Sequence, residues 1–276
     1  VSAYARQAKV IHIEIDPSEI NKIIHADYPI LGDVKKVLTK LLPKIEKAEH
    51  KEWIEEFKAC YEIEFEKVIK KDLHRNNGKN TMGEVVRKFS EKTEGKAIIV
   101  TDVGQHQMIA ARYSGFAQSR SFVTSGGLGT MGFGLPAAVG AQLGQPDRTV
   151  VTFIGDGGFQ MTIQEMGTIA QENIPVKIVI LNNHFLGMVR QWQELFFEKR
   201  YSFTEIKGPD FVALSNSYGI TARRISKSSE LDEAVSEMLK HDGPFLLEVV
   251  VEKEDNVFPM VPSGASVSDV ILEKTE

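Results

Sequence analysis

Strand-like and helix-like segments alternate along most of the chain after residue 80. Short runs of β-branched and other apolar residues, which predict buried strands, lie at 97–104, 121–125, 149–158, 176–183, 219–225 and 245–251. Segments with apolar residues three and four positions apart, which predict helices, lie at 81–89, 135–143, 161–171 and 229–240. This alternation is typical of a mostly parallel sheet with helices on both faces. The sequence therefore predicts an α/β fold.

The first 80 residues have a different pattern. Residues 9–16 predict a strand that leads into a helix near Pro17, and residues 33–45 have helical spacing. The next stretch is mostly charged and predicts exposed connecting helices, and HRNNGKN at 74–80 has the composition of a turn. We therefore expect three parts: an N-terminal part at 1–48, a helical linker at 49–79 and the main domain at 80–276.

Composition narrows the class of protein. The formal net charge of −5 gives no reason to expect a nucleic-acid surface. Apolar runs all fall short of the ~20 residues that a membrane span needs. Cys60 is the single cysteine, which excludes a disulfide framework and leads us to expect a reducing, cytoplasmic compartment. Because the N-terminus has neither a Met nor the apolar core of a signal peptide, we expect the chain to begin inside a larger protein.

The candidate chemistry lies in loops that follow predicted strands. These loops are 102–107, 125–132 and 155–158, and the pair Asn182–Asn183 occupies the same kind of position. The carboxyl ends of parallel strands meet at one edge of a sheet, and ligands of such folds bind there. We therefore expect these segments to gather around one site.

One glycine loop matches a dinucleotide-binding fingerprint in its letters. Gly127, Gly129 and Gly132 form G-x-G-x-x-G between a predicted strand and a predicted helix, and Asp147 follows about 20 residues later. Asp147, however, lies in the turn GQPDRT and not at the end of a strand, where an acid reads a ribose. We therefore interpret these glycines as allowing close packing of helix against strand, and we do not expect NAD to bind here.

The stretch FIGDGGFQM at 153–161 is the strongest candidate for chemistry. An Asp-Gly between apolar runs can form a hairpin turn, or it can end a strand in a glycine loop that faces a metal or a phosphate. The apolar residues of 161–171 have helical spacing, which favours a strand followed by a loop and a helix. Backbone N–H groups could then approach an anion at Gly155, Gly157 and Gly158.

Asp156 has a possible partner on the next predicted strand, which ends at Asn182 and Asn183. Adjacent parallel strands would place Asp156 beside Asn183. A carboxylate beside an anion requires a cation between them, and Mg²⁺ accepts oxygen ligands of which few are charged. We expect the adjacent His184 at the surface, because Mg²⁺ prefers oxygen to nitrogen. An Asp156 that only caps a turn is the alternative.

These motifs resemble those of a known family. Gly155-Asp156-Gly157 followed by Asn182-Asn183 is similar to the cofactor motif of thiamine-diphosphate enzymes. Segments that resemble the catalytic subunit of the acetolactate (acetohydroxyacid) synthases lie at 101–108, 124–138, 181–193 and 257–266. The resemblance covers nearly the whole chain and implies a thiamine-diphosphate-binding fold.

The resemblance implies a role for each matched residue. Asp156, Asn183 and the main-chain oxygen of Phe185 would bind Mg²⁺. The remaining implied contacts are with the diphosphate (Gln105, His106, Gly157, Gly158), with the two rings of the cofactor (Gly129, Met131) and with the substrate channel (Met188, Trp192).

The N-terminal part resembles the end of the central, FAD-binding domain of this family. Glu14, Ile15 and Asp33 fall where that domain touches FAD. Because nothing here resembles most of that domain, we do not expect this chain alone to bind FAD.

The resemblance also implies what the whole protein does. It would join two 2-oxo acids, pyruvate with pyruvate or with 2-ketobutyrate, with loss of CO₂ in branched-chain amino-acid biosynthesis. The cofactor would lie between this domain and the pyrimidine-binding domain of a second subunit in a homodimer or tetramer, with a regulatory small subunit as a further partner. The alternatives are a related enzyme (pyruvate oxidase, glyoxylate carboligase or a decarboxylase) and a non-catalytic assembly module.

In this family the glutamate that activates the cofactor lies on the pyrimidine-binding domain, which precedes the segments matched here, and nothing in residues 1–80 resembles that domain. We therefore assign no catalytic residue to this chain. We predict that purified residues 1–276, supplied with thiamine diphosphate and Mg²⁺, form acetolactate from pyruvate at no more than a trace rate in a colorimetric assay. Acetolactate formation above that rate would contradict the prediction.

Overall fold

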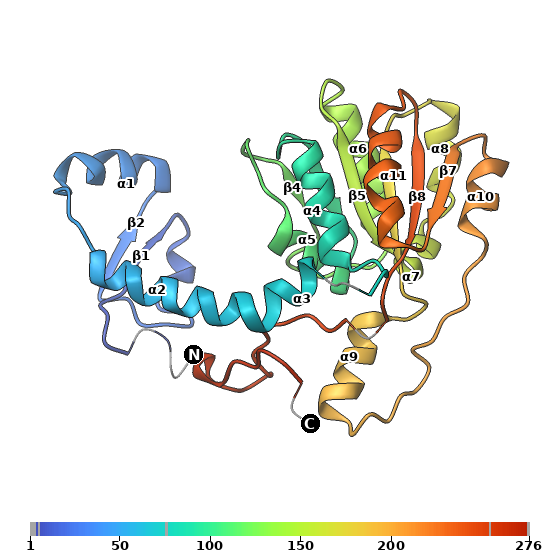
Figure 1. The fold of residues 1–276 in the computed structure, drawn as a ribbon. Helices are drawn as coiled ribbons and strands as arrows, with labels where there is room; N and C mark the ends of the chain where they lie inside the picture. Colours follow the sequence, from blue (N-terminus) through green and yellow to red (C-terminus); the bar gives the residue numbers. More distant parts are fainter. Residues whose placement is uncertain (1–3, 5, 75–76, 254, 275–276) are drawn as a thin grey trace. The chain divides into compact units, whose positions relative to one another are not determined.

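The computed structural model describes residues 4, 6–74, 77–253 and 255–274 (Figure 1). The chain divides into a small unit, residues 1–68 with 258–276, and a large unit, residues 69–257. The three-part division expected from the sequence, with boundaries after residues 48 and 79, stays a prediction.

The small unit contains a two-stranded parallel sheet. β1 (Ile11–Glu14) pairs with β2 (Tyr28–Leu31), and the 3-10 helix η1 (Pro17–Glu19) lies between them in the chain. The predicted strand at 9–16 and the helix near Pro17 are thus confirmed. Nearly every residue of α2 (Lys51–Glu64) is exposed, as the charged composition of this segment predicted. The remaining helices are α1 (Val34–Leu41), η2 (Leu42–Lys44), the π-helical η3 (Phe65–Ile69) and η5 (Val267–Asp269).

Six parallel strands form the sheet of the large unit, in the order β4-β3-β5-β6-β8-β7. The strands are β3 (Ile98–Thr101), β4 (Phe122–Val123), β5 (Val150–Gly155), β6 (Lys177–Asn182), β7 (Thr221–Ile225) and β8 (Phe245–Val250). Each was predicted within a few residues, and the parallel α/β sheet that the alternation indicated is confirmed.

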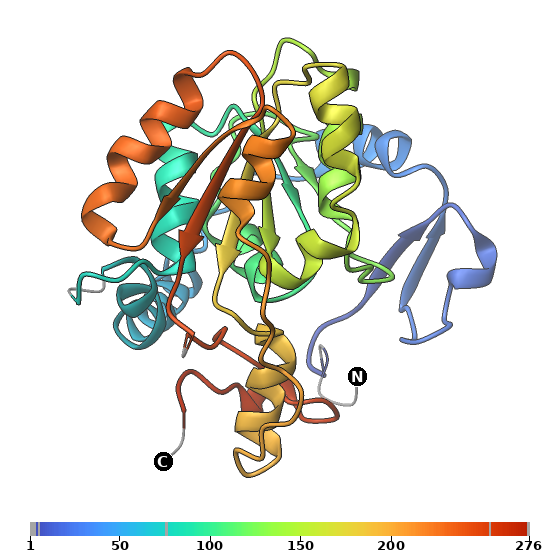
Figure 2. The ribbon, with the colours of Figure 1, turned by 90° about the vertical axis from the view of Figure 1, so that its right-hand side faces the viewer.

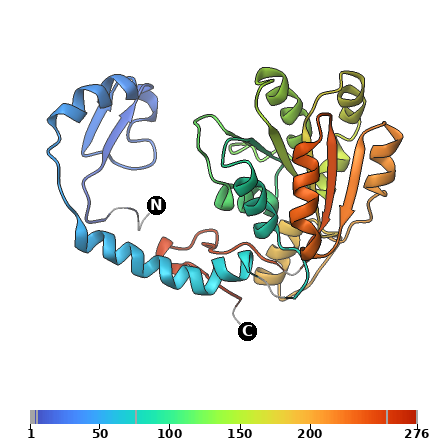
Figure 3. The same ribbon diagram turned by 45° about the horizontal axis from the view of Figure 1, so that its top comes forward.

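Helices cover both faces of this sheet (Figures 2 and 3). One face carries α4 (Met82–Lys92), α5 (Gln105–Tyr113) and α11 (Leu231–Lys240), and the other carries α6 (Gly134–Gly144), α8 (Glu165–Gln171) and α10 (Phe211–Ser217). The shorter or peripheral helices are α3 (Lys70–Leu73), α7 (Asp156–Met161), α9 (Gly187–Phe196) and η4 (Ser228–Glu230). Measured over the described residues, each helix is too short or too polar to cross a membrane.

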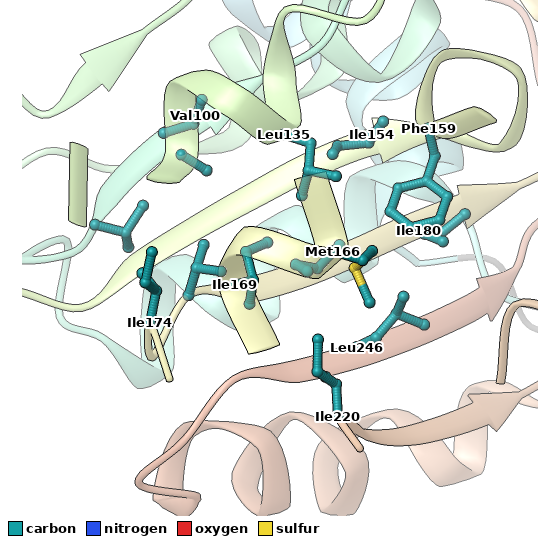
Figure 4. Close-up of a cluster of buried hydrophobic side chains, with 14 of the residues drawn as sticks. Val100, Leu135, Ile154, Phe159, Met166, Ile169, Ile174, Ile180, Ile220 and Leu246 are labelled. Carbon is teal, nitrogen blue, oxygen red and sulfur yellow. The ribbon is translucent and has the colours of Figure 1, made fainter. Parts of the chain in front are cut away.

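The central strands are buried on both faces, which explains why they read as continuous apolar runs. Ile154 and Ile180 belong to a cluster with Leu135 of α6 and Met166 of α8 (Figure 4). Phe153, one position earlier in β5, contacts the opposite helices instead, because successive side chains of a strand alternate between faces. Its ring meets that of Phe89 from α4 edge to face, with centroids 5.6 Å apart.

The structure differs from the predicted elements at three helices. One helix was predicted at 161–171, but the structure has two. The first, α7, begins at Asp156 and ends at Met161, and α8 follows after residues 162–164. The sequence patterns did not predict α5 or α10. α5 begins with buried polar residues that mask its helical period, and the seven residues of α10 are too few to establish one.

A buried charge lies at the amino end of β6. Lys177 is 4% exposed, and its Nζ donates hydrogen bonds to the carbonyl oxygens of His241 and Gly243, the latter at 2.7 Å. Burial lowers the pKa of Lys177 to about 8, against the opposing charge of Asp242. This ammonium is therefore held by main-chain oxygens of the loop that precedes β8.

The edge-to-face pair of Phe89 and Phe153 generates a stability prediction. Phe89→Ala should lower the free energy of unfolding by about 3–5 kcal/mol, because it leaves a cavity between α4 and β5. Urea denaturation measures this. Phe203 is 99% exposed, and Phe203→Ala should change the same quantity by no more than about 0.5 kcal/mol. Equal losses in the two variants would contradict the assigned core.

The pKa of Lys177 generates a second prediction. Between about pH 8 and pH 10.4 the unfolded chain retains a proton on this amine that the folded chain has released, so the free energy of unfolding rises with pH. Urea denaturation across this range should show a shallower rise in Lys177→Met than in the wild type. The exposed Lys240 directly precedes His241, one of the partners of Lys177, and Lys240→Met should keep the wild-type slope. Identical slopes in all three proteins would overturn the prediction.

Candidate functional site

A cavity of about 300 Å³ lies at the carboxyl edge of the sheet. Its walls come from the segments that follow β3, β5 and β6, and from the glycine-rich segment before α6. β5 and β6 end side by side, since Gly155 pairs with Leu181 in parallel register. The structure thus brings together all the residues predicted for the cofactor: Gln105, His106, Gly129, Met131, Gly155, Asp156, Gly157, Gly158 and Asn183.

Asp156 begins α7 and is 2% exposed. Burial raises the pKa of Asp156 to about 7. Nearby backbone N–H groups, among them those of Gly157 and His184, act to lower this pKa, and the charge of Glu248 acts with burial. Within the described part of the chain, the Oδ2 of Asp156 has no hydrogen-bond partner. A cation placed against this oxygen would supply the missing interaction and favour the ionised carboxylate.

Asn183 and Phe185 follow β6 and line the same cavity. Asn183 Oδ1 accepts a hydrogen bond from Phe185 N at 3.1 Å, which turns the loop back on itself. The main chain of Phe185 then pairs with Glu205 in an isolated antiparallel bridge. Searched over the described residues, the chain has no group of three or more His, Cys, Asp and Glu side chains suited to a metal. A cation here would therefore rely on one carboxylate with amide and main-chain oxygens, a donor set that suits Mg²⁺.

A series of hydrogen-bonded polar side chains holds the carboxyl end of β6 in position. The sequence patterns did not predict this network. Asn182 Nδ2 donates to Glu248 Oε1 at 2.8 Å, and Asn182 Oδ1 accepts from His184 N at 3.0 Å. Glu248 is 2% exposed, and its second oxygen accepts from Arg224 Nε at 2.7 Å. Arg224 in turn donates to Asp210, the N-cap of α10. The sequence feature that could have indicated this network is Glu248, an acid inside the apolar run of β8.

His106 is buried at the start of α5, where its ring packs close to Gly104 and Gly155. Burial lowers the pKa of His106 to about 4, although the nearby charge of Asp102 acts in the opposite direction. The imidazole is therefore neutral at pH 7. No described residue forms a hydrogen bond with its buried Nε2, and the residue lines the cavity.

Gln105 also lines the cavity, but its amide bonds to other protein groups. Its Nε2 donates to Gln191 Oε1 and to the carbonyl oxygen of Asp255, each at 3.0 Å. Its Oε1 accepts from Asn183 Nδ2 at 3.4 Å. The predicted direct contact between this side chain and a diphosphate stays a prediction.

Asp102 organises the glycine-rich wall and was not singled out in the sequence. It is fully buried, and its carboxylate accepts from Gly132 N at 3.1 Å and from Gly134 N at 2.9 Å. Gly129 and Gly132 have positive φ angles of 65° and 87°, which glycine adopts without strain. The wall that carries Gly129 and Met131 is thus held from behind by a carboxylate directly after β3.

Packing explains why glycine is needed at Gly158. A Cβ there would collide with the Asp102 carboxylate, which is held in place by its hydrogen bonds to Gly132 and Gly134. At Gly157 a Cβ would meet only the ends of the Leu186 and Ile206 side chains, which can move aside. The structural role is therefore assigned to Gly158, in addition to the anion contact expected from the sequence.

The two predicted channel residues separate in the structure. Met188 lines the main cavity, whereas Trp192, one turn further along α9, is 39% exposed and lines a neighbouring hollow with Val189 and Phe197. The ring of Trp192 packs against Phe196 at 5.0 Å between centroids.

The residues predicted to contact FAD lie in the small unit. Glu14 Oε1 accepts from Ile15 N at 2.7 Å, and Asp33 caps α1 through Lys36 N. Both carboxylates therefore have local structural partners. Asp147, the acid of the rejected dinucleotide fingerprint, is exposed in the turn before β5.

Comparison with known proteins places the chain in a family. Residues 102–249 match the C-terminal TPP binding domain of thiamine pyrophosphate enzymes, and residues 1–41 match the central domain of the same enzymes. The second match agrees with the sequence interpretation of the N-terminal part.

Curated relatives have similar sequences over nearly the whole chain. The acetolactate synthase isozyme 2 large subunit of Escherichia coli is 41% identical over 99% of this chain and 48% of its own length. The acetolactate synthase large subunit of Lactococcus lactis is 41% identical over 97% of this chain and 46% of its own. A chloroplastic acetolactate synthase of Oryza sativa is 40% identical over 99% and 44%.

The chain therefore spans about half the length of the curated relatives that it matches. The domain match begins directly after β3, and it includes β4, β5, β6, β7 and all the residues predicted for the cofactor that line the cavity. The chain belongs to the thiamine pyrophosphate enzymes, and within them it is homologous to the large subunits of acetolactate synthase.

Proposed function

We propose that this chain is the cofactor-anchoring part of an acetolactate synthase that joins two 2-oxo acids with loss of CO₂. The observation that carries the proposal is the buried, unpartnered Oδ2 of Asp156, which lines a cavity beside Asn183. A structural turn cap would have its oxygens satisfied within the chain, whereas a ligand-facing carboxylate leaves one free. The similarity to acetolactate synthase large subunits supports the choice of reaction.

In the proposed site, Asp156, Asn183 and the main-chain oxygen of Phe185 hold Mg²⁺. One carboxylate would be sufficient, because Mg²⁺ accepts few charged protein ligands and diphosphate oxygens and water would supply the rest. The cation would offset the cost of an ionised carboxylate at a position where burial raises the pKa to about 7. The N–H groups of Gly157 and Gly158 and the neutral ring of His106 then face the anion.

The other residues orient the cofactor and keep water out. Thiamine diphosphate, when bound, supplies the carbon nucleophile that attacks a 2-oxo acid. Gly129 and Met131 form the wall against which its rings would rest, and Asp102 keeps this wall in position. Met188 lines the cavity and contributes apolar surface on the side of the substrate.

The partners and the second cofactor are proposed for the whole protein. A second subunit would supply the pyrimidine-binding domain in a homodimer or tetramer, and a small subunit would regulate activity. We assign FAD to the whole protein only, since the carboxylates of Glu14 and Asp33 are engaged locally in the small unit. The cytoplasmic location rests on the single cysteine.

The proposal predicts that Asp156 controls cofactor affinity. Calorimetric titration of the chain with thiamine diphosphate and Mg²⁺ should show binding to the wild type, and Asp156→Asn should weaken it about 100-fold or more, because the only charged protein ligand is lost. Asp147→Asn, the same change in an exposed turn, should leave the affinity as it is.

Circular dichroism and the thermal transition of each variant test whether it is folded. Equal affinities in Asp156→Asn and the wild type would refute the assigned metal site. No binding by a folded wild-type chain would favour the assembly-module alternative.

A further inference from the structure

Apart from the proposed cofactor ligands, the large unit contains a fully buried glutamine on α9. Gln191 is 0% exposed and lies between the buried Arg190 and the exposed Trp192. Its Nε2 donates to the carbonyl oxygen of Val257 at 3.0 Å, and its Oε1 accepts from Val257 N at 2.8 Å. The amide therefore pairs with both main-chain groups of one residue, as a neighbouring strand would.

A second contact ties the same two segments together. Asn256 Nδ2 donates to Glu194 Oε2 at 2.9 Å, and Glu194 lies almost one turn after Gln191 on α9. The segment 255–257, which follows β8, is thus held along α9 by main-chain and side-chain bonds. Figure 1 shows the chain that leaves β8 passing the upper end of α9.

The Gln191 amide also faces the cavity wall. Its Oε1 accepts from Gln105 Nε2 at 3.0 Å, and the second hydrogen of that amide goes to the carbonyl oxygen of Asp255 at 3.0 Å. A glutamine amide has two N–H donors, so both are used and the orientation of Gln105 is fixed by a main-chain oxygen. Gln105 Oε1 then accepts from Asn183 Nδ2.

These bonds form a continuous series of buried carboxamides. It runs from the main chain of Val257 through Gln191 and Gln105 to Asn183, whose Oδ1 accepts from Phe185 N. Gly187 permits the close approach, because a Cβ there would collide with Gln105 Oε1 and Asn183 Nδ2. A buried amide that loses one hydrogen-bond partner is destabilised. Loss of a bond at one end of the series therefore also affects the hydrogen bonds of the neighbouring amide.

We infer that Gln191 is a positioning residue that couples the docking of segment 255–257 on α9 to the orientation of Asn183. The inference rests on the proposed function in one respect, that Asn183 faces the cofactor. When segment 255–257 is docked, Gln191 holds Gln105, and Gln105 holds the Asn183 amide with its oxygen toward the loop at Phe185. When the segment leaves, this restraint on the proposed metal ligand is lost.

The chain contains a matched control two residues further along the same helix. Gln193 makes the same type of two-point contact, since its Nε2 donates to Ser202 O and its Oε1 accepts from Ser202 N. This contact connects α9 to the segment before 204–206. Among the described residues, the bonds of the Gln193 amide go to Ser202 and not to Gln105 or Asn183. Gln193→Met therefore removes an equivalent clamp that lies outside the carboxamide series.

The experiment compares Gln191→Met with Gln193→Met by hydrogen exchange and by calorimetric titration with thiamine diphosphate and Mg²⁺. In Gln191→Met, exchange should become several-fold faster at Val257 and also at residues 183–187, and the dissociation constant should rise roughly 10-fold. In Gln193→Met, exchange should increase only around Ser202, and the dissociation constant should stay at the wild-type value. Exchange in β5 and β6 should be unchanged in both variants.

Faster exchange at Val257 without any change at 183–187 would overturn the inference, because Gln191 would then act only on its immediate neighbour. If Gln191→Met does not fold, Gln191→Glu replaces it, since this variant keeps both acceptor contacts and loses the donor to Val257 O. The exchange measurements need no cofactor. A wild-type chain that fails to bind thiamine diphosphate would therefore refute the proposed function, while exchange at 183–187 still decides the role of Gln191.

Discussion

The parallel pairing of β3, β5 and β6 is the constraint on which the site depends. The register places Val100 beside Thr152 and Ile154 beside Ile180, so all three strands end at the same edge. The segments that follow them must therefore share one volume, which is the cavity of about 300 Å³. The apolar contacts on both faces of the sheet fix this register, because a shift of one residue would turn Phe153 and Ile154 to the wrong faces. Core packing and site geometry thus have the same origin.

Burying polar groups at the carboxyl edge of the sheet costs free energy, and hydrogen bonds within the chain offset this cost. Asp102 is satisfied by loop N–H groups, Glu248 by Asn182 and Arg224, and Gln191 by Val257 and Gln105. Against this background two buried atoms of the cavity, Asp156 Oδ2 and His106 Nε2, have no partner among the described residues. Their surroundings differ from those of a core defect, because both residues line the same hollow. The most economical interpretation is that a ligand completes them.

Sequence patterns predicted the sheet, and they predicted which loops gather at its carboxyl edge. Strand runs and helical spacing record burial, and loops after parallel strands must meet, so Asp156 and Asn183 could be paired from their positions alone. The patterns failed where a residue's role depends on a partner far away in the chain. Gln191 looks like any polar residue on an amphipathic helix, and Asp102 looks like an ordinary loop acid. α5 was missed for the same reason, since its first residues are polar but face the site.

A buried charge lies at each end of β6, and the two differ in how the chain supplies their partners. At the amino end, Lys177 is enclosed by carbonyl oxygens of the loop at His241 and Gly243, so its partners come from the fold itself. Beside the carboxyl end, Asp156 lines the cavity, and its buried Oδ2 has no partner among the described residues. Burial shifts both pKa values toward the neutral form, so the shift alone does not distinguish them. The distinction lies in whether the chain completes the coordination of the charged group, and at Asp156 it does not.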